Sequence, residues 1–306
     1  MDTRFTGVIP PVVTPLNAAG QVDDDSLDRL VDHLLNAGVN GLFLLGSTAE
    51  TAYLTDRQRD QIVDRVVKRA NGAVPIIVGA IDMTAHRVID HAKRAEALGA
   101  DAIVSACPFY AINDVNEISD HFRAIAQAIP LPLFAYDVPV RLNRVKLSRD
   151  MLIQLGVEGT LAGVKDSSGD DVGFRRLVMA NEDAGHPLSL LTGHECVVDG
   201  MLLLGADGVV PGYANIDPVR YVDMWRAAQV KDWEKARQLQ DEICRGFEIV
   251  FTSVGRSGDA AGVGAFKTAM RALGIIETNQ MCFPVKALDG EVVAQIEQIV
   301  RDHIVG

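Results

Sequence analysis

Cysteine, histidine and basic side chains are scarce in this chain of 306 residues. Its four cysteines lie far apart and form no Cys-x-x-Cys pair, so neither a disulfide framework nor a zinc knuckle is expected, and a reducing cytoplasm is the simplest location. Its seven histidines are scattered without an HExxH motif, and we expect no metal. With 29 basic against 41 acidic residues, the net charge of −12 argues against a nucleic-acid binder and against an electrostatically held membrane partner.

Long apolar runs are missing as well. No run reaches the ~18 residues that a membrane-spanning helix needs. The first residues contain no basic segment followed by a longer apolar one, so we expect no signal peptide. Apolar residues nevertheless make up 48% of the chain, which argues against disorder. The chain is therefore expected to bury a large core without disulfides, as one large domain or two ordinary ones.

Short, nearly continuous apolar runs alternate with amphipathic helical patterns along most of the chain. The strand-like runs lie at residues 7–13, 41–45, 75–79, 102–105, 131–136, 161–165, 189–192 and 208–210. Helical patterns lie between them, among others at residues 24–36, 55–70, 84–98, 116–129, 148–155 and 171–180. Apolar runs without alternation are typical of a parallel sheet that is buried on both faces. Eight strand–helix units of this kind predict the α/β class and a (β/α)8 TIM barrel.

A doubly wound open sheet is the competing fold. It usually carries a G-x-G-x-x-G or G-x-x-x-x-G-K-[ST] phosphate loop after an early strand, and this sequence has neither. We therefore predict a catalytic barrel over residues 1–231. Residues 232–306 are predicted to form a C-terminal helical extension packed on the barrel. Its helices are expected at 232–250, 264–273 and 289–301, with a flexible, glycine-rich junction at 253–264.

A TIM barrel places its active site where its strands end, and Lys165 is the most informative polar residue in such a position. The chain has eight lysines, and Lys165 is the one that ends a strand-like apolar run. Burial of an ammonium group is costly unless it is paired or deprotonated, and a neutral amine adds to a ketone to form a Schiff base. The alternative is a lysine that reaches the rim, or that pairs with Asp166 or Asp170. The run by itself does not decide between the two.

Two further groups lie at the same expected edge. Tyr136 ends the strand before Lys165, so its phenol is placed to move protons during Schiff-base formation; alternatively, it is an aromatic side chain that fills the barrel. Ser47 and Thr48 form a turn before the next helix, and such turns bind carboxylates or phosphates through hydroxyl and backbone N–H groups. The alternative is an ordinary connection whose hydroxyls satisfy backbone groups.

Motifs along essentially the whole length carry a family resemblance. They are, in order, GVIPPVVTPL, GLFLLGSTAE, SACPFY, FAYDVPVR, AGVKDSSGD, LLTGHE and LGADGVVPGYANIDP. With these motifs the chain resembles the dihydrodipicolinate synthase/N-acetylneuraminate lyase family of pyruvate-dependent class I lyases. The resemblance implies an enzyme that joins pyruvate or another 2-keto acid to an aldehyde, or cleaves the product. It also implies no metal or organic cofactor, because a covalent lysine Schiff base supplies the electron sink.

The resemblance further implies catalytic roles. Lys165 would form the Schiff base, Tyr136 would move protons to and from the reacting centre, and Ser47 would link that phenol to Tyr110. In this family the residue at the Tyr110 position is normally lent by the neighbouring subunit across a tight dimer. Two such dimers form the usual assembly, so the resemblance implies a homotetramer.

Four more residues are implied in substrate binding. Thr48, with the backbone of its turn, would hold the pyruvate carboxylate, and Gly193 and Val210 would touch the substrate mainly through backbone groups. Arg141 matches the arginine that synthase members use near the carboxylate of aspartate semialdehyde, a group that arginine holds with two parallel hydrogen bonds. The alternative for Arg141 is a residue at the rim that balances an acidic surface.

The second substrate stays open at this stage. Arg141 and Tyr110 favour a dihydrodipicolinate synthase-like activity on pyruvate and aspartate semialdehyde. The departures from the synthase pattern are Ser47, Ala49, Asp137 and the residues Val140 and Leu142 on either side of Arg141. The pair His194 and Glu195 also points away from a strict synthase, because it lies where lyases bind sugar hydroxyls. They leave as alternatives an aldolase or dehydratase of 2-keto-3-deoxy sugar acids and an N-acetylneuraminate-type lyase. A catalytically silent sensor that binds keto acids is the alternative from another class.

Overall fold

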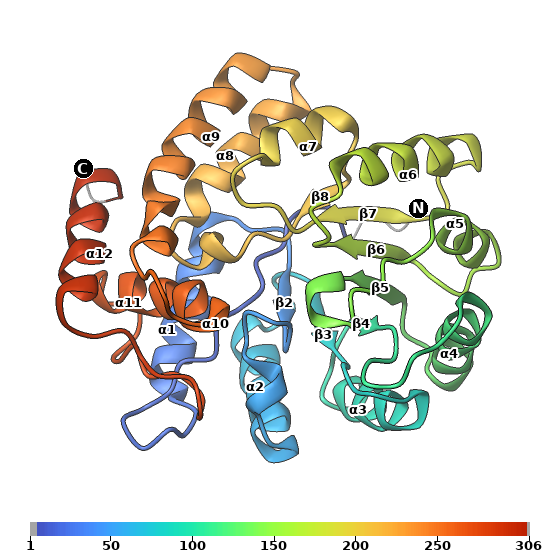
Figure 1. The fold of residues 1–306 in the computed structure, drawn as a ribbon, viewed down its shortest axis with the longest axis horizontal. Coiled ribbons are helices and arrows are strands. Elements are labelled where there is room, and N and C mark those ends of the chain that lie inside the picture. Colours follow the sequence, from blue (N-terminus) through green and yellow to red (C-terminus); the bar gives the residue numbers. More distant parts are fainter. Residues whose placement is uncertain (1–4, 305–306) are drawn as a thin grey trace.

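A parallel β-sheet forms the centre of the molecule (Figure 1). The computed structural model describes residues 5–304, and within them the sheet has eight strands. They are β1 (Gly7–Val8), β2 (Leu42–Leu44), β3 (Ile76–Gly79), β4 (Ala102–Ala106), β5 (Leu133–Asp137), β6 (Gly163–Asp166), β7 (Ser189–Thr192) and β8 (Gly208–Val209). Their hydrogen-bonded order is β1-β8-β7-β6-β5-β4-β3-β2. Each strand overlaps a predicted run, and β4, β5 and β6 extend one residue beyond theirs.

The two ends of this order, β1 and β2, are joined just beyond β1. Pro11 forms a parallel bridge with Phe43, and the Val12 N–H donates to the Phe43 carbonyl at 2.8 Å. The sheet therefore closes into the predicted (β/α)8 barrel. The first strand is shorter than the predicted run at 7–13, because Pro10 and Pro11 have no N–H group to offer a regular ladder.

Helices follow the strands and surround the sheet (Figure 1). They are α1 (Asp24–Ala37), α2 (Asp56–Ala70), α3 (Ala85–Ala97), α4 (Val115–Ala128), α5 (Arg149–Val157), α6 (Asp171–Asp183), α7 (Val198–Leu204) and α8 (Pro218–Gln229). Helix α1 shows why such segments are helical. Its leucines Leu27, Leu30 and Leu34 form one fully buried stripe, and the Asp23 side chain caps its first turn by accepting from the Ser26 N–H at 3.1 Å.

The chain after α8 forms further helices on one side of the barrel, opposite α3 to α6 (orange to red in Figure 1). They are α9 (Trp233–Phe247), α10 (Gly258–Ala261), α11 (Val263–Ala272) and α12 (Gly290–His303). Three of them lie where helices were predicted. The expected flexible junction at 253–264 instead contains α10, capped by the Ser257 hydroxyl. A boundary between residues 231 and 232 remains a prediction.

One buried ion pair joins these C-terminal helices to the barrel. Lys267 of α11 is fully buried, and its ammonium contacts the Glu50 carboxylate and donates to the Gln280 carbonyl at 2.9 Å. The second Glu50 oxygen accepts from the Cys282 N–H at 2.8 Å. Glu50 has a φ of +58°, a left-handed conformation that side-chain-bearing residues rarely adopt. Lys267 therefore stabilises an unusual backbone conformation in the loop between β2 and α2.

We expect Lys267→Met to lower the free energy of unfolding by about 3 kcal/mol, because it leaves the Glu50 carboxylate buried without its cation. Urea denaturation checks this. The matched control is Lys68→Met, which removes the exposed Lys68–Asp64 ion pair on α2 and should change stability by less than about 1 kcal/mol. Equal effects of the two substitutions would show that the buried pair is not stabilising.

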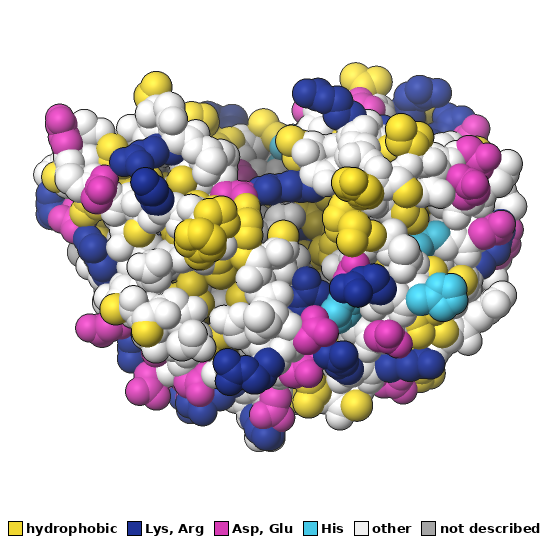
Figure 2. Space-filling model, turned by 60° about the horizontal axis from the view of Figure 1, so that its bottom comes forward, with side chains coloured by type: hydrophobic (Ala, Val, Ile, Leu, Met, Phe, Trp, Pro, Cys, Tyr) yellow, Lys and Arg dark blue, Asp and Glu magenta, His cyan; other side chains and the backbone are white. Residues whose placement is uncertain are grey.

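On the face shown in Figure 2, acidic and basic side chains are interspersed, and hydrophobic side chains gather in a hollow near its middle. Between residues 5 and 304, the structure has no helix long and apolar enough to span a membrane. The expectations that the protein binds no nucleic acid and lies in the cytoplasm remain predictions.

Candidate active site

Lys165 and Tyr136 lie side by side on neighbouring strands. The parallel register pairs Tyr136 of β5 with Lys165 of β6, so their side chains project from the same face of the sheet. Lys165 is only 5% exposed, and its Nζ lies 3.0 Å from the Tyr136 hydroxyl oxygen. The same Nζ lies 4.2 Å from the centre of the Tyr136 ring and 5.0 Å from that of Phe43. Lys165 is thus held among aromatic rings inside the barrel.

The alternative partners of Lys165 are not used. Among the described residues, no ion pair joins Lys165 to Asp166 or Asp170. The carboxylate of Asp166 instead pairs with Lys146 at 3.1 Å, and that of Asp170 accepts from the Gly173 N–H at 2.8 Å. Lys165 is therefore buried beside Tyr136 without an acidic partner on these two residues, and its Schiff-base role remains a prediction.

Ser47 extends this contact to a chain of three polar groups. Its hydroxyl oxygen lies 3.4 Å from that of Tyr136, and either group can be the donor. Burial alone would raise the pKa of the Tyr136 phenol, but the Lys165 charge and the hydrogen bonds from Ser47 and Lys165 bring this pKa below its usual value. A phenol with a lowered pKa gives up and takes back a proton more readily near neutral pH.

The turn after β2 presents unused donors beside these groups. Leu45 has a left-handed backbone with a φ of +57°. A Cβ atom at Gly46 would lie 2.6 Å from the Phe43 ring, so glycine is required where the turn passes over that ring. Within the described chain, the backbone N–H groups of Ser47 and Thr48 donate to no acceptor. Two unengaged N–H groups side by side can bind a carboxylate, and carboxylate binding at this turn remains a prediction.

Gly193 and Val210, predicted to touch the substrate through backbone groups, have their N–H groups engaged. The Gly193 N–H donates to the Asp166 carbonyl at 2.6 Å, and the Val210 N–H to the Thr192 carbonyl at 2.7 Å. A Cβ at Gly193 would lie 2.1 Å from the Ser167 hydroxyl, which explains the glycine there. Backbone contact with a substrate would thus use the carbonyl groups, which accept no hydrogen bond in residues 5–304.

Tyr110 is separate from the other predicted catalytic residues in the single chain. Its side chain is 87% exposed, and it forms no hydrogen bond with Ser47 or Tyr136 in the part of the chain described. The neighbouring Ile112 is also exposed. An exposed tyrosine next to an exposed apolar residue fits donation to a second subunit, so Tyr110 remains a predicted residue of a dimer.

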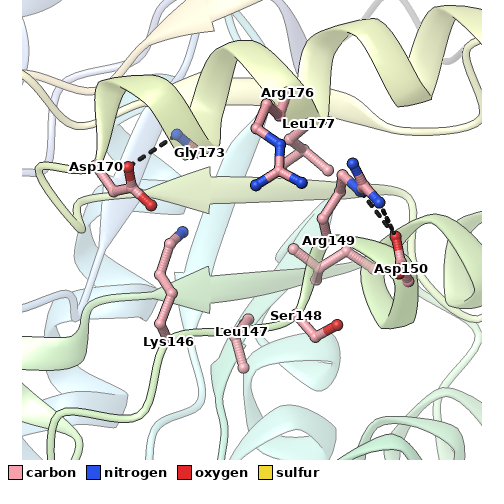
Figure 3. A pocket seen from close by; sticks show the side chains of 10 residues that line it. Lys146, Leu147, Ser148, Arg149, Asp150, Asp170, Gly173, Arg176 and Leu177 are labelled. Atoms are coloured by element: carbon pink, nitrogen blue, oxygen red, sulfur yellow. Dashed lines mark hydrogen bonds and ion pairs between the residues drawn. The ribbon is translucent and has the colours of Figure 1, made fainter.

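Of two cavities near the strand ends, one is lined by three of the predicted residues, Ser47, Tyr136 and Arg141, and Lys165 contacts this lining through Tyr136. It has a volume of about 270 Å³ and is lined by Ser47, Glu50, Thr51, Ala52, Tyr53, Ile81, Ala106, Phe109, Tyr136, Val138, Arg141, Leu142 and Asp259. The other, of about 290 Å³, lies between α5 and α6 and is lined by side chains such as Lys146, Arg149 and Arg176 (Figure 3). Because none of the predicted site residues lines the second cavity, we take the first as the candidate active site.

Lys146 connects the second cavity to a buried acidic pair. Asp137 and Asp166 follow Tyr136 and Lys165 in their strands and therefore project from the opposite face. The Lys146 ammonium contacts both carboxylates. Burial of Asp137, together with the charge of Asp166, raises the pKa of Asp137 to about 6 although Lys146 acts in the other direction. Two buried carboxylates thus share one ammonium behind the site.

This raised pKa predicts a pH-dependent effect of Asp137→Asn. Because the folded state holds the proton more tightly than the unfolded state, the contribution of Asp137 to stability is present at low pH and lost as the pH rises through about 6. The variant lacks this dependence. Its free energy of unfolding relative to the wild type should therefore rise by about 1 kcal/mol between about pH 5 and about pH 7.5.

Urea denaturation at several pH values measures this difference. Asp150→Asn is the control, because that carboxylate is 79% exposed on α5. A difference between Asp137→Asn and the wild type that stays constant with pH would contradict the assignment.

The His194 ring and the Glu195 carboxylate both contact neighbouring residues of the chain. The His194 ring lies 2.7 Å from the Asp171 carboxylate. The Glu195 carboxylate accepts from the N–H groups of Gly212 at 2.6 Å and Tyr213 at 3.1 Å. Burial raises the pKa of Glu195 to about 7, although the hydrogen bonds from these two N–H groups act in the opposite direction. Glu195 therefore shapes the turn after β8 rather than standing free in the cavity.

Several residues that line the candidate site were missed in the sequence, among them two polar ones next to Arg141. Asp259 and Tyr53 line the same cavity as Tyr136 and Arg141. Asp259 lies in the glycine-rich segment that was expected to be a flexible junction. No periodic pattern of hydrophobic residues there indicates where the side chain of Asp259 lies in the fold. Tyr53 follows the turn motif but stands outside the part of it that suggested carboxylate binding. Neither carries a sequence signal that separates it from other surface residues.

Comparisons with known proteins show which sequences and folds this chain is similar to. The sequence pattern of the Dihydrodipicolinate synthetase family matches residues 4–303. A 4-hydroxy-tetrahydrodipicolinate synthase from Phenylobacterium zucineum is 34% identical over 253 residues, 82% of this chain and 84% of the relative. The solved dihydrodipicolinate synthase of Bacteroides thetaiotaomicron has a TM-score of 0.92 and 30% identity, covering 99% of this chain and 100% of the other. YagE from E. coli K12, solved in complex with pyruvate, has a TM-score of 0.90 and 26% identity, covering 97% and 98%.

Proposed function

The chain belongs to the dihydrodipicolinate synthetase family of class I lyases, and we propose that it forms a Schiff base between Lys165 and pyruvate and joins it to an aldehyde, or runs this reaction in reverse. The observation that supports this most strongly is the 3.0 Å contact between Lys165 Nζ and the Tyr136 hydroxyl inside the barrel. A nucleophilic nitrogen and a proton-transferring group within hydrogen-bond distance are what Schiff-base formation needs. The pyruvate bound to the similar structure of YagE supports pyruvate as the first substrate.

The first half of the proposed reaction forms the imine. The Lys165 nitrogen attacks the keto carbon of pyruvate, while the free N–H groups of Ser47 and Thr48 bind the pyruvate carboxylate. The nitrogen gives up one of its two protons, which Tyr136 passes to the former keto oxygen; a second proton reaches this oxygen from solvent through Ser47 and Tyr136, and the oxygen leaves as water. The product is a protonated imine, which makes the pyruvate methyl group acidic.

The second half forms the carbon–carbon bond. Loss of a methyl proton gives an enamine, whose terminal carbon attacks the aldehyde carbon, and the aldehyde oxygen becomes a hydroxyl by taking up a proton. Water then hydrolyses the imine and restores the lysine. The electron sink is the imine itself, so we propose that the reaction needs no metal or organic cofactor.

The aldehyde is the open part of this proposal. Aspartate semialdehyde fits if Arg141 is free to bind a carboxylate, and the names of relatives such as the Phenylobacterium zucineum enzyme support this candidate. If Arg141 is not free to bind a carboxylate, an aldehyde derived from a 2-keto-3-deoxy sugar acid fits better. We further propose that two tight dimers form a homotetramer, in which Tyr110 completes the site of the neighbouring subunit.

A substrate panel tests the proposed function. Pyruvate consumption is measured with aspartate semialdehyde, and pyruvate release is measured with several 2-keto-3-deoxy acids, in both cases by lactate dehydrogenase and NADH. We expect turnover of at least one of them. Binding of pyruvate without turnover of any would instead favour the silent keto-acid sensor.

A further inference from the structure

Arg141 does not stand free in the active-site cavity. Its guanidinium pairs with one carboxylate oxygen of Asp259, from α10 of the C-terminal helices. The Tyr53 hydroxyl donates to the other carboxylate oxygen at 3.0 Å. The Asp259 side chain is 13% exposed, whereas that of Arg141 is 46% exposed. All three line the cavity that contains Ser47 and Tyr136. The outer part of the cavity is thus a connected network of one cation, one anion and one phenol.

This network changes what Arg141 can bind. The hydrogen bond from Arg141 holds the pKa of Asp259 below its usual value, so the carboxylate is ionised near neutral pH. A substrate carboxylate placed on Arg141 would therefore lie beside a second negative charge, which disfavours its binding. The positive charge of Arg141 is already balanced before any substrate arrives.

An uncharged hydroxyl group meets the same network differently. A hydroxyl donates one hydrogen bond and accepts others, so it can donate to Asp259 and accept from Arg141 at the same time. Tyr53 and the Asp259 carboxylate offer further partners of both kinds. A chain of adjacent hydroxyl groups can therefore satisfy these groups without introducing a net charge.

We propose that Asp259 is a specificity-determining residue that makes this site prefer an uncharged hydroxyaldehyde over an aldehyde that carries a carboxylate. This inference rests on the proposed Schiff-base function and identifies the class of its second substrate. It replaces the expectation that Arg141 receives the carboxylate of aspartate semialdehyde. Asp259 acts by occupying Arg141 and by accepting hydroxyl groups of the substrate.

The test compares two aldehydes with pyruvate as the common partner. D-glyceraldehyde is the uncharged hydroxyaldehyde, and succinic semialdehyde is the aldehyde with a carboxylate. We expect kcat/KM of the wild type to favour D-glyceraldehyde by about tenfold or more. In Asp259→Asn the negative charge is gone and Arg141 can bind a carboxylate, so the ratio should move towards succinic semialdehyde by about tenfold.

Two further variants distinguish the effect of Asp259 from a general loss of negative charge and test whether it acts through Arg141. Asp289 is an exposed carboxylate in the same C-terminal region and lies 3.1 Å from Arg256. Asp289→Asn should leave the ratio of the two kcat/KM values unchanged. In the double variant Asp259→Asn/Arg141→Ala, the gain with succinic semialdehyde should disappear. A gain that persists without Arg141 would contradict the route through this arginine.

The outcomes also distinguish this inference from the proposed function. Failure of borohydride to trap pyruvate on the wild type would overturn both. A trapped adduct together with a wild-type preference for succinic semialdehyde would overturn the role of Asp259 alone, and this result needs no variant to fold. An unchanged ratio in a folded Asp259→Asn, verified by thermal unfolding, would do the same.

Discussion

Replacement of Lys165 by alanine is expected to abolish the exchange of pyruvate methyl protons with solvent. In D2O the wild type should incorporate deuterium into the methyl group, because the proposed imine converts to an enamine and back without needing an aldehyde. Alanine keeps the strand but removes the nitrogen that forms the imine. We expect a loss of at least about 10⁵-fold, equivalent to roughly 7 kcal/mol of transition-state stabilisation. Proton NMR of the pyruvate methyl signal measures the rate.

Two controls accompany this variant. Lys165→Arg retains a positive charge beside Tyr136 but not a nucleophilic amine, so it should be as inactive as alanine. Lys68→Ala removes an exposed lysine on α2 and should exchange at the wild-type rate. Exchange by Lys165→Ala at a rate near that of the wild type would mean that the enamine forms on another group, or without the protein.

Tyr136→Phe should be the next most damaging substitution. Phenylalanine keeps the ring against Phe43, at a centroid distance of 6.3 Å, and keeps its face towards Lys165. It removes the hydroxyl that connects Lys165 to Ser47, and with it the proton transfer that turns the keto oxygen into water. We expect the deuterium exchange rate to fall by about 10³-fold, within the range for loss of a general acid–base group.

The matched control for this substitution is Tyr213→Phe. Tyr213 is also a buried tyrosine, but its hydroxyl has no hydrogen-bond partner in the part of the chain described. Its removal should leave exchange unchanged. Borohydride trapping over long incubation should still label Tyr136→Phe slowly, since Lys165 is intact. If Tyr136→Phe exchanged as fast as Tyr213→Phe, the phenol would have no part in proton transfer.

The barrel and the contact between Tyr136 and Lys165 were predictable because both depend on short apolar runs in the sequence. Continuous apolar runs mark strands that are buried on both faces, and the order of the strands makes neighbours of β5 and β6. Tyr136 and Lys165 end these two runs, so their proximity follows from the topology. The turn at Ser47 and Thr48 was recognisable for the same reason, since it directly follows a strand-like run.

The outer part of the cavity was not predictable because it depends on long-range packing. Asp259 reaches Arg141 across 118 residues of sequence, and Lys267 reaches Glu50 across 217. Both contacts depend on where the C-terminal helices pack against the barrel, and no hydrophobic period in the barrel sequence indicates that position. The sequence therefore indicated an arginine suited to a carboxylate, whereas the structure shows that arginine already paired.

The most direct test of the central claim is to trap the imine on the wild-type protein. The protein is incubated with pyruvate and borohydride, its intact mass is measured, and the modified peptide is identified after digestion. The proposed mechanism predicts a gain of one reduced pyruvate per chain, located on Lys165. An unchanged mass, or a label on any other lysine, would contradict it.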